Sequence, residues 1–371
     1  MKSVLVLAAL GAISACGARA APQVVQSEAG EIRIERLASL DNPWGMSYLP
    51  DGRLLISEKP GRLRILANGK LSEPVQGVPK VAHGGQGGLL GVQVHPDFAQ
   101  NSFVYLSFSE PGANGLIGGA VARGKLADSQ LSNVSVIWRQ APKTTGEGHF
   151  GGRLAFARDG KLFISSGERQ KLEPAQDMSG TLGKIVRINP DGSVPADNPF
   201  VNRTGIRPEI WSSGHRNPLG IAIHPASSEL WENEMGAKGG DEINRIQKGG
   251  NYGWPVVSEG SHYDGRRIPR HSTRPEFIAP VHFWASSISP SSLAFYTGDR
   301  FAQWRGNLLL GGLSSKALLR LSLDGNKVTN EERIAMGERI RDVIQAPDGA
   351  VLLLTDGDNG ALLRLTPAAA R

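Results

Sequence analysis

The chain has 371 residues, enough for one large domain or two ordinary ones, and its 40% hydrophobic and 20% charged residues are ordinary for a globular protein. Gly at 47 and Pro at 23 favour turns over long helices. The net charge of +6 is scattered, without a run of five or six basic residues, so nucleic acid is a poor candidate partner. An acidic small ligand or plain solubility explains the charge better.

The N-terminus has the pattern of an export signal. Lys2 precedes an apolar run from Val4 to Ile13, and Ala18-Arg19-Ala20 matches an A-x-A cleavage site. The run is too short to remain as a transmembrane anchor. We therefore expect residues 1–20 to be a signal peptide and residues 21–371 to be a single domain in the periplasm.

Cys16 complicates this prediction. Ile13-Ser14-Ala15-Cys16 resembles a lipoprotein cleavage box, which leaves a lipid anchor at Cys16 as the alternative to release. Cys16 is also the only cysteine in the sequence. Cleavage after Ala20 would therefore exclude disulfides, zinc–thiolate sites and thiol catalysis from the mature protein.

After the N-terminus, one phrase recurs along the chain: an apolar run, an Asp-Gly turn, a second apolar run, a Gly turn and a third run. Clear copies begin at Met46, Leu154 and Val343, and looser copies occupy 92–109, 221–246 and 292–321. Each copy is typical of an antiparallel meander. Six copies at a spacing of roughly 45 to 70 residues predict an all-β, six-bladed β-propeller. A pair of β-sandwiches is the alternative, but sandwiches do not repeat internally at this period.

Polar residues recur near the start of successive repeats. In a propeller the loops before the innermost strands converge on one end of the central axis, so these side chains should meet in one pocket. They are Gln86, His149, Arg216 with Asn217, Ser287, and Arg339 with Arg341. Taken singly, each has a structural explanation: a lone histidine is usually hydrogen-bonded in the fold, Glu168 fits a solvated turn, and paired arginines usually form salt bridges.

The stretch from Glu209 to Pro255 is the richest in candidate chemistry. Arg216 and Asn217 suit a planar, oxygen-rich acidic ligand. The Gly-rich loop Gly236–Glu242 offers carbonyl and carboxylate oxygens, which suit Ca²⁺, although it lacks the spacing of an EF-hand. This stretch predicts a loop-built site for an anionic cofactor, a cation, or both.

Six motifs occur in an order that is similar to one known family. They read GGQGGLLG, GHFGGRL, GKIVRINPDGSVPADNPF, EIWSSGHRNPLG, GGDEINRIQKGGNYGWP and RIRDVIQAPDG. They resemble the soluble aldose sugar dehydrogenases that use pyrroloquinoline quinone (PQQ), in the glucose/sorbosone dehydrogenase family, over nearly all of the mature chain. The resemblance implies a six-bladed propeller that oxidises aldoses at the anomeric carbon to aldonolactones, with PQQ and Ca²⁺ as cofactors. Electrons would pass to an external acceptor, a quinone or a redox protein.

The resemblance also assigns roles to residues. His149 would be the general base, Glu168 would orient it, and Arg216 would stabilise negative charge that develops on the quinone. The matching cofactor-binding positions are Gln86, Arg216, Asn217, Tyr263, Ser287, Gly312, Leu313, Ser314, Arg339, Ile340 and Arg341. The matching metal positions are Gly236 and Ala237 for a calcium ion at the quinone, and Glu242 and Tyr252 for a structural calcium ion.

Some positions depart from the family pattern. Where relatives have a cofactor-contacting lysine this chain has Ser314, and Lys316 stands two residues later as a candidate replacement. Met235 and Ala237 replace the Gln and Pro of some relatives beside the calcium.

We expect a monomer. Two other functions stay open: a calcium-dependent propeller lactone hydrolase, and a non-catalytic propeller that binds a glycan or a protein.

Overall fold

The repeated Asp-Gly phrase forms the turn between the first and second strands of a sheet. In the first copy Gly52 has a φ of 87°, and the Asp51 carboxylate accepts the backbone N–H of Arg53 at 3.0 Å. The same pair of features recurs at Asp159-Gly160 and at Asp348-Gly349. A residue with positive φ closes such a turn at little strain only when it is glycine, which is why the phrase repeats.

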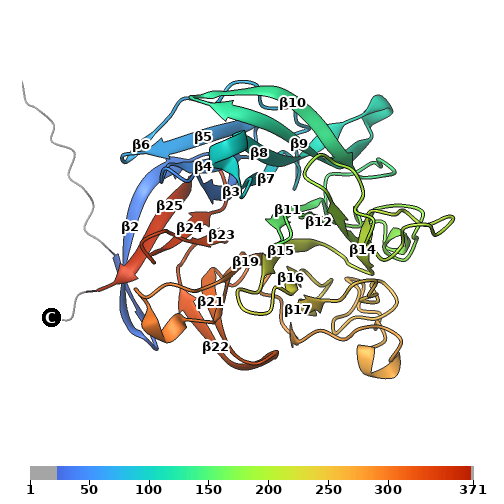
Figure 1. Ribbon diagram of the computed structural model, residues 1–371. Coiled ribbons are helices and arrows are strands. Elements are labelled where there is room, and N and C mark those ends of the chain that lie inside the picture. The colour runs from blue at the N-terminus through green and yellow to red at the C-terminus, as the bar shows by residue number, and fades with distance from the viewer. Residues whose placement is uncertain (1–22, 369–371) are drawn as a thin grey trace, which may run out of the picture.

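The computed structural model of the chain describes residues 23–368, and the predicted signal peptide with Cys16 lies outside this range. Six antiparallel sheets stand around a central axis (Figure 1). We number these blades in chain order. Blade 1 contains β3 (Pro43–Tyr48), β4 (Leu54–Glu58), β5 (Arg62–Ala67) and β6 (Lys70–Leu71). Blade 2 contains β7 (Leu89–Val94), β8 (Phe103–Pro111), β9 (Ile117–Ala127) and β10 (Gln130–Arg139). Blade 3 contains β11 (Gly151–Phe156), β12 (Leu162–Ser166), β13 (Lys184–Ile188) and β14 (Ile210–Ser213).

The second half of the ring repeats the arrangement. Blade 4 contains β15 (Pro218–Ile223), β16 (Leu230–Glu234), β17 (Asp241–Ile246) and β18 (His282–Trp284). Blade 5 contains β19 (Pro290–Phe295), β20 (Leu308–Gly312), β21 (Ala317–Asp324) and β22 (Lys327–Ala335). Blade 6 contains β23 (Ile340–Gln345), β24 (Val351–Thr355), β25 (Gly360–Pro367), β2 (Gly30–Leu40) and β1 (Gln23–Ser27). The predicted six-bladed, all-β propeller is confirmed.

Helices are few and short in the described chain. They are the α-helix α1 (Phe98–Asn101) and the 3₁₀ segments η1 (Ala113–Gly115), η2 (Glu173–Ala175), η3 (His271–Thr273) and η4 (Ala302–Trp304). None of the helices within residues 23–368 is long and apolar enough to cross a membrane.

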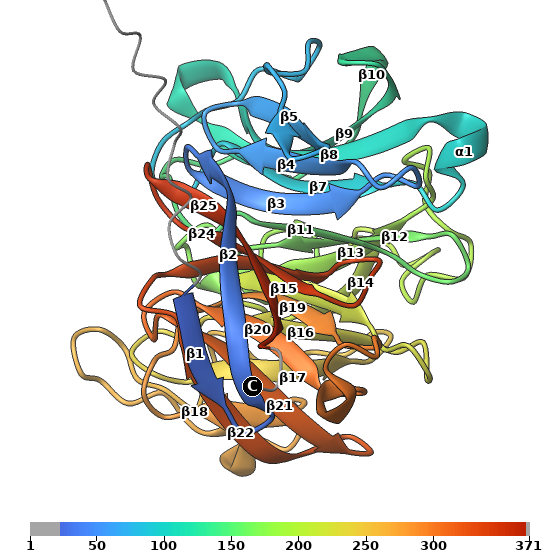
Figure 2. The same ribbon diagram turned by 90° about the vertical axis from the view of Figure 1, so that its left-hand side faces the viewer.

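The two ends of the described chain close the ring. Strand β2 pairs antiparallel with β25, and β1 lies outside β2 (Figure 2). Ile32 and Ile34 of β2 are buried in one apolar cluster with Trp304 of blade 5 and Leu353 of blade 6. The first residues of the ring therefore complete its last blade, so closure requires a contact between the two ends of the described part of the chain.

A β-bulge interrupts the pairing of the first strand in every blade, close to where that strand begins. Such bulges bend the strand and re-aim its side chains. Hydrogen bonds that each involve one polar side chain then join the bulged strand of each blade to a neighbouring blade. They are Ser57 Oγ to the Leu90 carbonyl, Ser107 Oγ to the Gly152 carbonyl, Arg153 Nε to the Leu219 carbonyl, Asn233 Nδ2 to the Ser292 carbonyl, Ser291 Oγ to the Ile340 carbonyl, and the Met46 N–H to the Asp342 carboxylate.

Arg153 connects blades across the axis as well as around it. From β11, its guanidinium donates to Asp342 of blade 6 at 2.8 Å and to the Ser291 carbonyl of blade 5 at 3.2 Å. It also lies over the Trp44 ring of blade 1, with 4.3 Å between its central carbon and the ring centroid. One side chain therefore fixes the inner strands of several blades relative to one another.

The buried pair predicts a large loss of stability when one partner is neutralised. In Asp342→Asn the Arg153 guanidinium would lack its counter-charge, and we expect the free energy of unfolding to fall by about 3–5 kcal/mol. The control is Asp51→Asn, which removes an exposed ion pair with Arg53. We expect this variant to change the free energy of unfolding by less than about 1 kcal/mol. Chemical denaturation measures both. Equal small losses would contradict a structural role for the Arg153–Asp342 pair.

Candidate active site

A cavity of about 310 Å³ opens where the loops before the six first strands converge. We call these the lead-in loops. Every blade contributes to its wall, which consists of Asn42, Trp44, Lys59, Gly85, Gln86, Phe150, Gly151, Leu219, Met235, Ser289, Leu313, Arg339, Arg341 and Asp356. Gln86, Leu313, Arg339 and Arg341 are among the residues expected there from the sequence. The structure thus brings together side chains that are far apart in the chain.

His149 lies in the lead-in loop of blade 3, immediately before Phe150 and Gly151 of the cavity wall. Its Nδ1 is 2.5 Å from Oε1 of the buried Glu168. The other carboxylate oxygen, Oε2, accepts the backbone N–H groups of Lys171 and Leu172. The carboxylate therefore holds the Nδ1–H form of the imidazole, and Nε2 is the nitrogen that can accept a proton.

Burial lowers the pKa of His149 below its ordinary value, and the positive charge of Arg216 lowers it further. The hydrogen bond and negative charge of Glu168 act in the opposite direction without reversing the shift. Burial raises the pKa of Glu168, but the hydrogen bond from His149 and those from backbone N–H groups outweigh it, so that pKa is also lowered. At neutral pH the pair is therefore a neutral imidazole beside a carboxylate, the arrangement of a general base.

The backbone of His149 adopts a left-handed conformation with a φ of 48°, which few non-glycine residues adopt. Arg169 supports this conformation. Its buried guanidinium donates to the carbonyls of Gly148, Ile117 and Gly146, and lies 3.8 Å from the centroid of the Phe150 ring. The loop that carries the imidazole is thus held by a side chain outside the cavity wall.

Gln86 and Asn217 connect the lead-in loops of three blades. Gln86 Oε1 accepts the backbone N–H of His149 at 2.9 Å and lies 3.5 Å from Asn217 Nδ2. Asn217 Oδ1 accepts the backbone N–H of Gly151 at 3.3 Å. Both amides were expected to bind a cofactor, and here both also position the histidine loop.

Arg216 is buried and turned toward the Gly-rich loop of blade 4. Its Nη1 donates to the carbonyls of Met235 at 3.1 Å and Gly236 at 2.5 Å, and its Nη2 donates to Tyr263 Oη at 3.1 Å. Its Nε is buried without a hydrogen-bond partner. Tyr263 is largely exposed and touches the site through Arg216. Arg216 therefore binds the Gly-rich loop through Nη1 and Tyr263 through Nη2, and its buried Nε–H is left unpaired.

Sequence reasoning missed a pattern of acids that hold the lead-in loops. An acidic residue ends or follows the second strand in four blades, and it binds the lead-in loop of the same blade. The pairs are Glu58 with the Asp41 N–H, Glu168 with His149, Glu234 with the N–H groups of Arg216 and Asn217, and Asp356 with Arg339 and Arg341. The segments LLISE, LFISSGE, LWENE and LLLTD carry this signal at equivalent points of the repeat.

The wall beside blade 6 is cationic. Arg339 and Arg341 both bind Asp356, each with Nε–oxygen distances of 2.9 Å. Lys59, which sequence reasoning also missed, extends from blade 1 into the same cavity. Positive groups outnumber the carboxylate, so this part of the cavity favours an anionic ligand.

The remaining expected cofactor positions are arranged around blade 5. Leu313 is part of the cavity wall, and Ser314 is exposed beside it, with its Oγ donating to the Ser287 carbonyl at 3.2 Å. Ser287 Oγ donates to Asp241 at 2.8 Å. Gly312 and Ile340 are buried strand residues, and the Ile340 carbonyl accepts a hydrogen bond from Ser291. Ser287 therefore holds neighbouring segments through both its hydroxyl and its carbonyl, and Ile340 does so through its carbonyl.

The expected metal positions are of two kinds: backbone positions around Gly236 and Tyr252, and the side chain of Glu242. The Gly236 carbonyl already accepts Arg216 Nη1, and Ala237 is buried among apolar side chains. A calcium ion at this carbonyl would share the oxygen with the Arg216 guanidinium, and the two positive charges would repel each other. The Tyr252 carbonyl lies 3.0 Å from Nε2 of His271, so it too has a partner.

Glu242 instead belongs to a buried acidic cluster on blade 4. Strands β16 and β17 place Glu234 opposite Glu242, and Glu232 opposite Asn244. Burial raises the pKa of Glu232 and of Glu242 well above its ordinary value, and the charge of Glu234 adds to both shifts. A cavity of about 10 Å³, the size of one water or ion, is lined by Glu234, Glu242 and Tyr252. Ligand atoms of His215, Glu232 and Glu234 also lie within 4.8 Å of one another.

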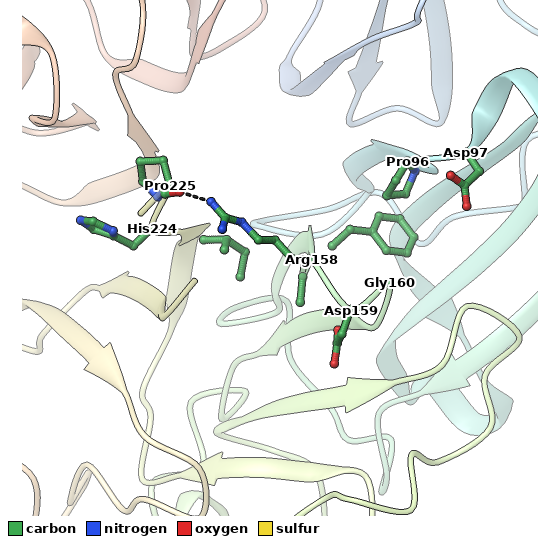
Figure 3. Close-up of a pocket in the computed structure, with 10 residues that line it drawn as sticks. Pro96, Asp97, Arg158, Asp159, Gly160, His224 and Pro225 are labelled. Carbon is green, nitrogen blue, oxygen red and sulfur yellow. Dashed lines mark hydrogen bonds between the residues drawn. The ribbon is translucent and has the colours of Figure 1, made fainter. Parts of the chain in front are cut away.

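A larger cavity of about 620 Å³ lies at the opposite ends of the first strands (Figure 3). Its wall comes from the turns that follow β7, β11 and β15. Arg158 crosses to donate to the Pro225 carbonyl, and Nδ1 of His224 accepts the backbone N–H groups of Ala226 and Ser227. These hydrogen bonds stabilise turns, and none of the expected site residues lines this cavity. The candidate chemistry is therefore confined to the lead-in end.

Residues 40–364 match the model of the family described as glucose/sorbosone dehydrogenase. The chain belongs to the glucose/sorbosone dehydrogenase family. It is 46% identical over 338 residues to aldose sugar dehydrogenase YliI of Escherichia coli K12, which covers 88% of this chain and 91% of that protein. The enzyme class expected from the sequence, a dehydrogenase of sugars, is confirmed by this membership.

Solved structures of a glucose dehydrogenase and of an aldose sugar dehydrogenase share the fold. A glucose dehydrogenase crystal structure has a TM-score of 0.88 and 48% identity, and covers 91% of this chain and 99% of that one. The PQQ-bound aldose sugar dehydrogenase of Streptomyces coelicolor has a TM-score of 0.74 and 29% identity, and covers 90% of this chain and 98% of that one.

The contact between His149 and Glu168 predicts how the imidazole responds to a loss of charge. Burial and the positive charge of Arg216 lower the pKa of His149, and both remain in Glu168→Gln. The carboxylate that raises this pKa is replaced by a neutral amide, so we expect the pKa of His149 to fall further. NMR titration of the imidazole nitrogens measures it. Glu173→Gln, an exposed carboxylate on the same loop, is the control and should leave it unchanged. A rise in the pKa in Glu168→Gln would contradict the assigned pairing.

Proposed function

We propose that this dehydrogenase oxidises aldose sugars at the anomeric carbon to aldonolactones, with PQQ and Ca²⁺ as cofactors. The observation that carries the proposal is the pairing of His149 with Glu168, in the loop that leads directly into the wall of a cationic axial cavity at Phe150. The PQQ-bound relative with 29% identity supports the choice of cofactor.

The residues of the cavity suit a planar quinone that carries carboxylates. Arg339, Arg341 and Lys59 offer positive charge for the carboxylates, and Gln86 and Asn217 offer amides. The unpartnered Nε of the buried Arg216 is a further donor at the same end of the axis. When bound, the quinone would supply the two-electron acceptor for the hydrogen of the anomeric carbon.

The protein's own part in the reaction is to take a proton. Nε2 of His149 would accept the proton of the anomeric hydroxyl, and the resulting imidazolium would lie against the Glu168 carboxylate. Because Oε2 of Glu168 binds two backbone N–H groups, the carboxylate stays fixed when its partner becomes charged. Arg216 and Arg169 add positive charge nearby, which keeps the imidazole neutral before the reaction.

The two groups of candidate calcium ligands differ in how well they suit the ion. The buried carboxylates of Glu232, Glu234 and Glu242 suit a structural Ca²⁺, since an ion would compensate charges that burial otherwise disfavours. The Gly236 carbonyl suits an ion less well, because the ion would lie next to the positively charged guanidinium of Arg216. We therefore assign calcium a role in the blade 4 cluster and derive no catalytic step from it.

The other functions considered from the sequence fit the cavity less well. A calcium-dependent lactone hydrolase needs several carboxylates around an axial metal. Among the described residues that line the cavity, Asp356 is the one carboxylate, and two arginines bind it. A propeller that only binds a glycan or protein has no need of an oriented neutral histidine. We propose export to the periplasm through residues 1–20, an external electron acceptor and a monomeric state.

The proposal predicts calcium-dependent sugar oxidation. The apo-protein, titrated with PQQ and Ca²⁺ and then given glucose and an artificial electron acceptor, should reduce the acceptor saturably. His149→Ala should bind PQQ while its kcat falls by roughly 10²- to 10⁴-fold, because the general base is lost. His224→Ala, at the opposite end of the axis, is the control and should retain turnover.

Either of two results would overturn the proposal. Failure of the wild-type chain to bind PQQ would exclude the cofactor. Unchanged turnover in His149→Ala would remove this residue from the mechanism. A thermal melt with and without a chelator tests calcium separately, since Glu242→Gln should abolish the calcium-dependent rise in Tm.

A further inference from the structure

The backbone of Lys59 is held on both sides. Its N–H donates to the Asn42 carbonyl, and its carbonyl accepts the Leu89 N–H, both at 2.9 Å. A Cβ atom at Gly88 would come within 2.2 Å of the Lys59 carbonyl oxygen, so the chain packs tightly there. These contacts fix where the side chain of Lys59 starts, between the lead-in loops of blades 1 and 2.

The ammonium group of Lys59 lies in the cavity with few partners. Its Nζ donates to the Gly85 carbonyl at 2.7 Å. Within residues 23–368 it forms no ion pair with a carboxylate. Burial and the positive charge of Arg341 lower its pKa, and Asp356 and Asp358 offset this only in part. An anion in the cavity would supply the missing counter-charge.

Lys59 lines the same cavity as Arg339 and Arg341, the two arginines that bind Asp356. Arg339 and Arg341 reach the cavity from blade 6, and their shared carboxylate holds them in place. Lys59 reaches it from blade 1, beside Gln86 of the blade 2 loop. A planar ligand with several carboxylates could therefore be bound at two edges, by the arginines and by the lysine.

We propose that Lys59 binds a carboxylate of the polyanionic cofactor and is a principal determinant of its affinity. This proposal rests on the proposed function. It differs from the sequence analysis, in which Lys316 is the candidate replacement for the missing lysine. Lys316 is exposed on the turn between β20 and β21, and it does not contribute to the cavity wall.

The test is a PQQ titration followed by tryptophan fluorescence, in the presence of Ca²⁺ and without sugar. In Lys59→Met, the Kd for PQQ is expected to rise roughly ten- to hundredfold, the size of one lost charge-assisted hydrogen bond. Lys59→Arg should bind within about threefold of the wild-type chain, because the charge is kept. Lys316→Met is the matched control and should bind like the wild type.

A second probe shows whether charge is responsible. With the trimethyl ester of PQQ, which has no free carboxylate, the difference between wild type and Lys59→Met should disappear. Lys59→Gln serves as the neutral variant if Lys59→Met does not fold. Wild-type binding with an unaffected Lys59→Met, or an equal loss in Lys316→Met, would overturn the proposal and leave the function standing. Failure of the wild type to bind PQQ would overturn both.

Discussion

The buried contact between Arg153 and Asp342 is the interaction on which the arrangement of the blades depends. A propeller keeps its blades in place only if their inner strands are fixed around the axis, and here one guanidinium contacts four other blades. Arg153 also lies on β11, the strand that the His149 loop leads into, so the residue that joins the blades also anchors one end of that loop. Stability of the ring and geometry of the site are therefore coupled.

Two local features of the ring, the β-bulges and the acids after the second strands, build the candidate active site. The bulge near the start of each first strand bends it as it leaves the lead-in loop. The acids after the second strands, such as Glu168 and Glu234, then bind the loop groups directly. As a result the base is oriented by a carboxylate that is itself immobilised by backbone N–H groups, so little reorganisation is needed when a proton moves.

The sequence predicted the fold well because the Asp-Gly turn is a local signal that each blade repeats. It also placed Gln86, His149 and Arg339 at one end of the axis, since equivalent loops converge by symmetry. It could not show that Arg216 would turn to the Gly236 carbonyl, because several partners compete for one guanidinium. Nor could it place Lys59 in the cavity, since that depends on how blades 1 and 6 face each other.

The most direct test of the central claim, that His149 and Glu168 form the base, is the pH dependence of the single-turnover rate of aldose oxidation. The rate should rise with pH through one group whose pKa is below the ordinary histidine value, and then stay level. In Glu168→Gln the midpoint should move to lower pH and the plateau should fall. A midpoint that does not move in Glu168→Gln, or that persists in His149→Ala, would contradict the account.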